Sequence, residues 1–382
     1  MRLIVVGTGI TGSACGYAAS VLGADVVLVD SGQPGRATAA GAGIICPWSS
    51  PGEDRDRFAF GCAGARAYPA LIAALGEEGE TALGYRRCGA LVLASGTGRQ
   101  QEIRRDLAAR QDEWPEMGEI SLLGPAQAQQ LFPPLGPGRP AVRIGGGARV
   151  DGRLIAAALR RAAGRHGASV ISGEARLRCA HDAVSGVTVA GEFIGADAVV
   201  AATGAWTDTF LEPAGVALGV TAQRGQIMHI GLGLTDTSRW PVILPGGSGH
   251  YLLAFDDSRV VAGATRETGS GFDYRVTPGG LAEVLGEALS VAPGLASASY
   301  LETRVGFRPV GPGDRPLLGP VPGIAGLLVA TGLGATGLTM GPYAGELTAR
   351  AALGLDLPSD LRPFRPAGTE PGGRGAGSGQ ED

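Results

Sequence analysis

Residues 1–30, MRLIVVGTGITGSACGYAASVLGADVVLVD, decide the fold of this chain. An apolar strand over residues 3–6 leads into the glycine pattern GTGITG at residues 7–12, which opens a helix of small residues. A second apolar strand follows and ends on Asp30. This order of strand, glycine turn, helix, strand and acid predicts a βαβ unit that binds a dinucleotide.

The three glycines of this pattern have different predicted roles. Gly7 permits the tight turn after the strand, Gly9 lets backbone N–H groups approach a pyrophosphate, and Gly12 lets the helix pack closely on the sheet. Asp30 lies 18 residues after Gly12, close to the roughly 20 residues at which an acid meets a ribose hydroxyl. An acid at this place favours an unphosphorylated ribose, as in FAD or NAD, over NADP.

The composition narrows the classes of function. The chain has 382 residues, of which 44% are hydrophobic, so it can bury a large core and form two or three domains. Its net charge of −4 argues against a nucleic-acid partner. Since every basic residue other than histidine is an arginine, a Schiff-base lysine and a P-loop lysine are excluded.

Cysteine and histidine spacing predicts neither a metal site nor a disulfide framework. The five cysteines contain no C-x-x-C pair, and the four histidines show no ligand spacing. Because the apolar N-terminus is itself the first strand of the nucleotide fold, we do not interpret it as a signal peptide. A cytoplasmic location is therefore expected. No run approaches the roughly 18 consecutive apolar residues of a membrane span, so any membrane contact is expected to be peripheral.

The middle of the chain predicts more of the same sheet and then a second one. Helices are expected at 58–75, with a break at Pro69, at 101–111 and at 153–166, and strands at 89–95, 168–172, 175–179, 185–190 and 198–202. Residues 124–147 are rich in Pro and Gly and predict a connection between domains. From 216 to 303 the pattern changes to alternating strands at 225–230, 251–255 and 259–264, with one helix at 278–291. This region predicts an antiparallel sheet inserted into the α/β fold.

The C-terminal part carries a second glycine set, Gly332, Gly334 and Gly337, between a strand at 325–330 and a helix that ends near residue 353. An independent nucleotide site is disfavoured, because no strand follows this helix. The helix N-terminus is instead expected to point at a ligand shared with the first motif, where its partial positive charge stabilises a reduced flavin. Residues 366–382 are Gly, Pro and polar residues and are predicted to be disordered.

At this point the chain resembles the FAD-dependent D-amino-acid oxidase superfamily, in its glycine oxidase and bacterial D-amino-acid dehydrogenase branch. The resemblance covers about residues 1–360 and rests on GTGITG with Asp30, AAGAGIICPW (39–48), VVAATGAW (199–206) and GFRPVGPGDRPLLGPVPGIAGLLVATGLGATGLTMGP (306–342). It implies an α/β fold: a Rossmann-like, discontinuous FAD-binding domain with an inserted antiparallel-sheet substrate domain. The implied domains are 1–84, 145–215 and 304–365 for FAD, and 85–144 and 216–303 for the substrate.

The resemblance also assigns the site residues. Arg308 of GFRP is implied to clamp the substrate carboxylate, with help from Tyr251, whereas Arg304 on the same strand face suits a surface role. A planar guanidinium matches a carboxylate with two parallel hydrogen bonds. The implied FAD-binding residues are Gly7, Gly9, Ile10, Thr11, Gly12, Asp30, Ser31, Ala42, Gly43, Ile44, Ala175, Thr203, Gly204, Trp206, Gly332, Leu333, Gly334, Gly337, Leu338 and Thr339.

FAD is expected to be held non-covalently. Cys46 is near the FAD loop, but the attachment cysteine of sarcosine-oxidase relatives comes from the C-terminal part, where this chain has no cysteine after Cys179.

The implied reaction is oxidation of the C–N bond of a small amino acid by hydride transfer to flavin N5, a D-amino acid being the first expectation. The imino acid then hydrolyses to a 2-oxo acid and ammonia. An oxidase of glycine, sarcosine or another secondary amine such as a hydroxyproline isomer or an opine remains open, as does a non-catalytic flavoprotein subunit. A tRNA-modifying relative is disfavoured by the acidic composition.

The electron acceptor is a quinone, a carrier or oxygen. Because some flavin amine oxidases use a lysine to activate oxygen and this chain has none, a dehydrogenase is weakly favoured. The chain leaves its oligomeric state open.

Overall fold

The strands of residues 1–30 lie in the middle of a six-stranded sheet of order β19-β20-β12-β1-β2-β8. The computed structural model describes residues 1–50, 52 and 54–367 of the chain. β1 is parallel to both neighbours, since Val5 pairs with Leu28 of β2 and with Val200 of β12, while β19 at the edge is antiparallel to β20. The strands are β1 (Arg2–Val6), β2 (Asp25–Asp30), β8 (Ser169–Ser172), β12 (Ala198–Ala201), β19 (Leu317–Pro320) and β20 (Leu327–Thr331).

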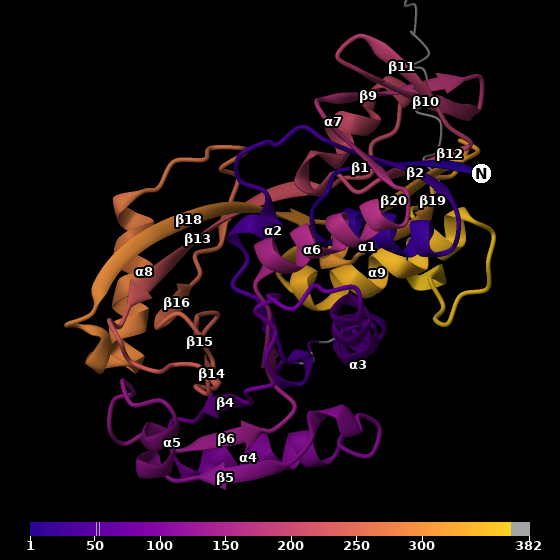
Figure 1. Cartoon of the computed structure of the whole chain (residues 1–382). Coiled ribbons are helices and arrows are strands. Elements are labelled where there is room, and N and C mark those ends of the chain that lie inside the picture. Colours follow the sequence, from indigo (N-terminus) through magenta and orange to yellow (C-terminus); the bar gives the residue numbers. More distant parts are fainter. Residues whose placement is uncertain (51, 53, 368–382) are drawn as a thin grey trace, which may run out of the picture.

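Alternate residues of β1 face two different layers, which explains why this strand is apolar throughout. Leu3 and Val5 pack against helices, whereas Ile4 and Val6 pack against a three-stranded sheet. Figure 1 shows the helices and the small sheet on opposite sides of the central sheet. The helices are α1 (Ile10–Val21), α6 (Gly152–Arg165) and α9 (Gly337–Ala352), and the small sheet is β9 (Ala175–Ala180), β10 (Ala183–Val189) and β11 (Glu192–Gly195).

A nine-stranded sheet forms the other half of the molecule and takes strands from two distant segments. β13 and β18 pair along their whole length and extend from beside the six-stranded sheet into this second sheet (Figure 1). The strands are β4 (Ala90–Leu93), β5 (Ile120–Leu123), β6 (Ala141–Ile144), β13 (Thr221–Gly231), β14 (Val242–Pro245), β15 (Tyr251–Phe255), β16 (Arg259–Gly263), β17 (Glu267–Thr268) and β18 (Ser299–Val310).

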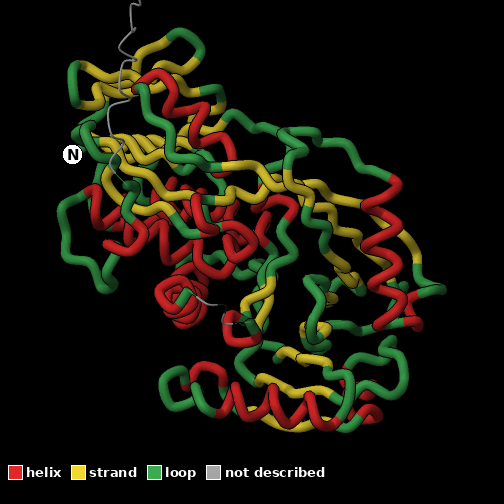
Figure 2. The backbone as a smooth tube through the Cα atoms, turned by 180° about the vertical axis from the view of Figure 1, so that it is seen from behind, coloured by secondary structure: helices red, strands yellow, loops and turns green. Residues whose placement is uncertain are grey.

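Three helices cover the second sheet. α8 (Pro278–Val291) packs on β13 and β16, and α4 (Thr97–Ala108) and α5 (Pro125–Leu131) pack beside β5. Seen from behind in Figure 2, helices lie along the lower rim and the outer side of this sheet. The helix predicted at 278–291 is therefore confirmed with its bounds.

The predicted fold class is confirmed, but residues 124–147, predicted as a connection between domains, contain helix α5 and strand β6 of the second sheet. Two further local differences follow. β4 and β14 are parallel, so the second sheet is mixed rather than wholly antiparallel. These strands come from distant segments, so no hairpin forces them to be antiparallel. Their relative direction is therefore set by tertiary packing. The second difference is that no break occurs at Pro69.

Helix α3 (Arg55–Glu77) continues through Pro69, contrary to the predicted break. Proline removes one intrahelical hydrogen bond, but α3 is held against α9, where Gly64 lies so close to the backbone of Thr339 that an added Cβ would meet its carbonyl oxygen at 2.6 Å. By length and composition alone α3 could cross a membrane. It also packs against α9 and α6. Of the tail predicted to be disordered, residues 368–382 lie outside the described residues.

Candidate active site

The turn from β1 into α1 accepts no residue larger than glycine at two places. Gly7 has φ +95°, and a Cβ there would lie 2.3 Å from the carbonyl oxygen of Ala202. A Cβ on Gly12 would lie 1.8 Å from the carbonyl oxygen of Gly7. Packing of α1 against the turn therefore requires these glycines, as the sequence pattern predicts.

The N-terminus of α1 opens on a cavity. Gly9, Ile10 and Thr11 all line this cavity. Gly9 is the N-cap residue and has no side chain to cap the helix, and no acid lies in the first turn, although Thr38 accepts a hydrogen bond from the backbone N–H of Ile10 at 2.9 Å. The exposed end of a helix with unpaired N–H groups favours an anion such as a phosphate.

Asp30 ends β2 beside this helix and is held in place by its surroundings. Its carboxylate accepts hydrogen bonds from the backbone N–H of Thr8 at 2.6 Å and of Gly32 at 2.7 Å, and it pairs with Arg36 at 3.1 Å. Burial alone would raise the pKa of Asp30, but these hydrogen bonds and the charge of Arg36 together lower it. Asp30 is therefore a fixed carboxylate on the cavity wall, which suits a hydroxyl donor.

The loop after α2 (Ala37–Ala40) is pressed against its neighbours. Gly43 has φ +99°, and a Cβ there would lie 1.8 Å from the carbonyl oxygen of Val150. The loop leads into β3 (Ile44–Ile45), which pairs with β7 (Ala148–Arg149). Ala42, Gly43 and Ile44 consequently present mainly backbone to the cavity.

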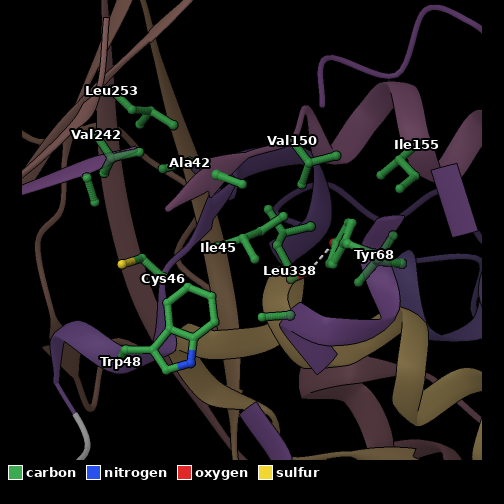
Figure 3. Close-up of a cluster of buried hydrophobic side chains, with 14 of the residues drawn as sticks. Ala42, Ile45, Cys46, Trp48, Tyr68, Val150, Ile155, Val242, Leu253 and Leu338 are labelled. Carbon is green, nitrogen blue, oxygen red and sulfur yellow. Dashed lines mark hydrogen bonds between the residues drawn. The ribbon is translucent and has the colours of Figure 1, made fainter. Parts of the chain in front are cut away.

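The start of α9 is fixed to the same loop although it lies about three hundred residues away in the sequence. Thr339 donates a hydrogen bond to the carbonyl oxygen of Ile44 at 3.0 Å, and Tyr68 donates one to that of Leu338. Figure 3 shows Leu338 beside Ile45 and Val150, with the dashed bond from Tyr68. Gly334, Gly337 and Leu338 thereby reach the cavity from the C-terminal part of the chain.

The carboxyl end of β12 supplies a third wall. Thr203, Gly204 and Trp206 line the cavity, and the side chain of Thr331 on β20 donates to the carbonyl oxygen of Gly204 at 3.0 Å. Ala175 at the start of β9 lines it as well. Strand ends in such a crevice are where α/β folds bind nucleotides.

The cavity has a volume of about 570 Å³ and brings most of the predicted residues together. Gly12, Gly332 and Thr339 lie behind the wall and support it. The predicted residues on the wall are Gly7, Gly9, Ile10, Thr11, Asp30, Ser31, Ala42, Gly43, Ile44, Ala175, Thr203, Gly204, Trp206, Leu333, Gly334, Gly337, Leu338, Tyr251 and Arg308. The cofactor roles of single residues stay predictions.

The described residues fit an FAD group on two grounds. Glycines line the cavity wall where the backbone is most closely packed against its neighbours. At Gly204, in contrast, an added Cβ would meet no atom within 4 Å, so the cavity in front of Gly204 is open. Two helices, α1 and α9, direct their N-termini to the same cavity, and neither has an acid in its first turn. One N-terminus suits the pyrophosphate, and the other suits the negative charge of a reduced flavin.

Arg308 enters the cavity from β18 without an acidic partner. Its Nη1 donates to the carbonyl oxygen of Thr265 at 3.0 Å and to Gln223 at 3.4 Å, and it forms no ion pair with any described residue. Its guanidinium lies flat against Gly225, where a Cβ would be 2.7 Å from both Nη atoms. Burial lowers the pKa of Arg308, which nonetheless stays a cation. A half-buried cation without a partner in a cavity is an anion-binding group.

Tyr251, the first residue of β15, lines the same end of the cavity. Its ring lies over Gly263, where a Cβ would be 2.5 Å from the hydroxyl oxygen, and among the described residues this hydroxyl has no hydrogen-bond partner. Burial raises the pKa of Tyr251, while the charges of Arg308 and Arg266 oppose that rise. The hydroxyl is thus a protonated donor close to the Arg308 guanidinium.

Arg304 pairs with Glu302 at 2.5 Å, away from the cavity wall, which agrees with the surface role expected for it. His250, next to Tyr251 in the chain, lies 3.5 Å from Glu283. Cys46 is buried, and burial raises its pKa to about 12.

Sequence reasoning missed several residues of the wall, among them Arg36, Arg266 and Phe307. Arg266 comes three residues after the end of β16, and no motif marks it. Phe307 lies within the GFRP motif, and its place next to Arg308 was the one signal that could have predicted it as a cavity residue.

A dinucleotide-binding sheet and a second sheet that line one cavity are typical of a nucleotide-dependent enzyme. Residues 2–351 match the DAO family model, described as FAD dependent oxidoreductase. The chain belongs to this family, and FAD is its cofactor.

The chain is similar to several known proteins along nearly its whole length. It is 44% identical to the uncharacterized oxidoreductase YurR of Bacillus subtilis (strain 168), over 96% of this chain and 98% of that one. Its structure matches that of iminodiacetate oxidase from Chelativorans sp. BNC1 with a TM-score of 0.94 and 47% identity, over 97% of this chain and 100% of that chain. It matches glycine oxidase from Geobacillus kaustophilus with a TM-score of 0.82 and 26% identity, over 96% and 98%.

Proposed function

We propose that this enzyme oxidises the C–N bond of an N-substituted glycine, a secondary amine with a carboxylate one carbon from the nitrogen. The observation that carries the proposal is the free Arg308 guanidinium beside the free Tyr251 hydroxyl on a wall of the FAD cavity. A carboxylate takes two parallel N–H bonds from Arg308 and one O–H bond from Tyr251. Such a grip holds the adjacent carbon in one orientation, which is the main contribution that positioning makes to the rate.

FAD, when bound, accepts a hydride from the carbon next to the nitrogen. The carbon–nitrogen bond becomes an imine, and water then cleaves it to a carbonyl compound and a shorter amine. The acids on the cavity wall, Asp30, Glu174 and Glu212, come from the nucleotide-binding half, and no described carboxylate or histidine lines the wall beside Arg308. The amine therefore enters as the neutral base, with its proton lost to water beforehand.

The choice of a secondary amine over a D-amino acid rests on similarity. The iminodiacetate oxidase that matches this chain over 97% of its length is named for a secondary amine. The D-amino acid expected from the sequence would use the same Arg308 clamp and is the second candidate. Because both solved relatives named above are oxidases, oxygen is the acceptor we favour, in place of the dehydrogenase expected from the lack of lysine.

FAD is proposed to be non-covalent and the protein cytoplasmic. No cysteine of the described chain lines the cavity, and all five cysteines are free, as a reducing compartment would leave them.

The test is anaerobic reduction of the FAD-loaded protein with a panel of amines. Sarcosine, N-ethylglycine and iminodiacetate should bleach the visible flavin absorbance, and glycine and D-alanine should bleach it more slowly. Readmitting air then shows whether oxygen is the electron acceptor, because the reduced flavin of an oxidase regains its colour in air and releases hydrogen peroxide. If dithionite bleaches the flavin but none of the amines does, the protein is a non-catalytic flavoprotein and the proposal fails.

A further inference from the structure

A second cation, Arg266, lines the same cavity as Arg308 and has no role in the clamp described above. It follows β16 in the chain, and its side chain is exposed. Among the described residues it takes part in no ion pair and no side-chain hydrogen bond. Arg266 is therefore an unpaired cation on the cavity wall.

Arg266 lies at the substrate end of the cavity. Its Nε is 3.3 Å from the point that a Cβ on Gly249 would occupy, and Gly249 lies two residues before Tyr251 on the same wall. The charge of Arg266 also acts on both clamp residues, since it lowers the pKa of Arg308 and that of Tyr251. The two guanidinium groups therefore face one space.

The acid closest to Arg266 in the sequence is not available to neutralise it. Glu267 accepts from Arg224 at 2.5 Å, from Gln226 at 2.8 Å and from Thr265 at 2.7 Å. With Glu267 saturated by these donors, two like charges face the same cavity without a protein anion between them. Like charges repel, and a ligand with two anionic groups removes this repulsion.

We propose that Arg266 binds a second carboxylate, and that the substrate is an amine flanked by two carboxylates, of which iminodiacetate is the smallest example. This inference rests on the proposed function, because Arg308 must already hold the first carboxylate. A substrate with one carboxylate leaves the Arg266 charge unmatched. Arg266 is then the residue that selects dicarboxylic over monocarboxylic amines.

Binding is tested first with two ligands that cannot be oxidised at nitrogen. Diglycolate and methoxyacetate match iminodiacetate and sarcosine atom for atom, with an ether oxygen in place of the NH. Their dissociation constants are measured on the FAD-loaded protein from the change in the flavin spectrum. The wild type should bind diglycolate at least about tenfold more tightly than methoxyacetate, since a hydrogen bond to a charged group is worth about that factor.

Three variants isolate the role of the side chain. Arg266→Gln should bring the ratio of the two dissociation constants to about one, chiefly by weakening diglycolate. Arg266→Lys keeps the charge and should restore part of the preference. Arg275→Gln is the matched control, because Arg275 is exposed in the next segment, between β17 and α8, but is paired with Asp273 at 2.9 Å and lies off the cavity wall.

Turnover gives the second readout. The ratio of kcat/KM for iminodiacetate over sarcosine should fall about tenfold in Arg266→Gln, chiefly through a higher KM for iminodiacetate. If sarcosine is oxidised but neither ratio responds to Arg266→Gln, the second subsite is wrong and the proposed function stands. If diglycolate binds through Arg266 but no amine is oxidised, the subsite stands and the proposed function is wrong.

Discussion

Replacing Arg308 by methionine removes the guanidinium and keeps a side chain of similar reach on β18. Arg308 faces the cavity without an ion pair from the described residues, so its charge is available to the ligand. Removing one partner of a buried charge pair costs about 2–5 kcal/mol, and we take about 2–3 kcal/mol because Arg308 is half-buried. At about 1.4 kcal/mol per tenfold, a carboxylate ligand should bind about 30- to 140-fold more weakly.

The assay is a titration of FAD-loaded Arg308→Met with methoxyacetate, read from the flavin spectrum, with FAD content and thermal midpoint measured beside it. Arg304→Met is the control, since Arg304 is on the same strand but pairs with Glu302 at 2.5 Å. This variant should bind methoxyacetate within about twofold of the wild type. An Arg308→Met protein that keeps its FAD and binds methoxyacetate within threefold of the wild type would refute the carboxylate clamp.

Three further outcomes are expected. Tyr251→Phe should weaken methoxyacetate binding about tenfold. Because burial raises the pKa of Tyr251, wild-type binding should show no loss from this hydroxyl between pH 7 and 9 when titrated across that range. Gly225→Ala puts a methyl group against the Arg308 guanidinium and should weaken the same ligand about 10- to 100-fold with FAD retained, whereas Gly286→Ala, with open space around it, should bind normally. Asp54→Asn keeps the cap on Arg57 of α3 but loses the charge pair with Arg315, which should cost about 0.5–1 kcal/mol at pH 7 in urea unfolding. Hydrogen bonds from Arg315 lower the pKa of Asp54 to about 2, so the wild type should hold this advantage above about pH 4 and lose it as the pH falls toward 2; an advantage that is constant with pH would show that the pair is not its source.

Much of the nucleotide-binding half was predictable, because its signals are local. Gly7 and Gly12 are required by contacts within one strand–helix–strand unit, and Asp30 follows from the length of that unit. The helix at 278–291 was predictable for the same reason, since its apolar positions repeat within its own length.

The substrate half was harder to predict from the sequence, because its residues are brought together by pairing of strands that are far apart in the chain. Arg308 was found through the GFRP motif and not through any period in the chain. The flat position of its guanidinium over Gly225 depends on the antiparallel register of β13 and β18, in which Gln223 pairs with Arg308. A sequence pattern specifies neither that register nor the rotamer that follows from it.

By itself, then, the sequence determined the βαβ nucleotide unit and the cofactor class, and it predicted Arg308 as the clamp for a carboxylate. Only the tertiary structure decided that β4 and β14 run parallel and that Arg266 shares a cavity with Arg308 while Glu267 is held by Arg224. The physical reason is the distance along the chain over which the interactions act. Backbone turns and apolar periods act over a few residues, whereas the convergence of charged side chains depends on strand pairings between segments far apart in the chain.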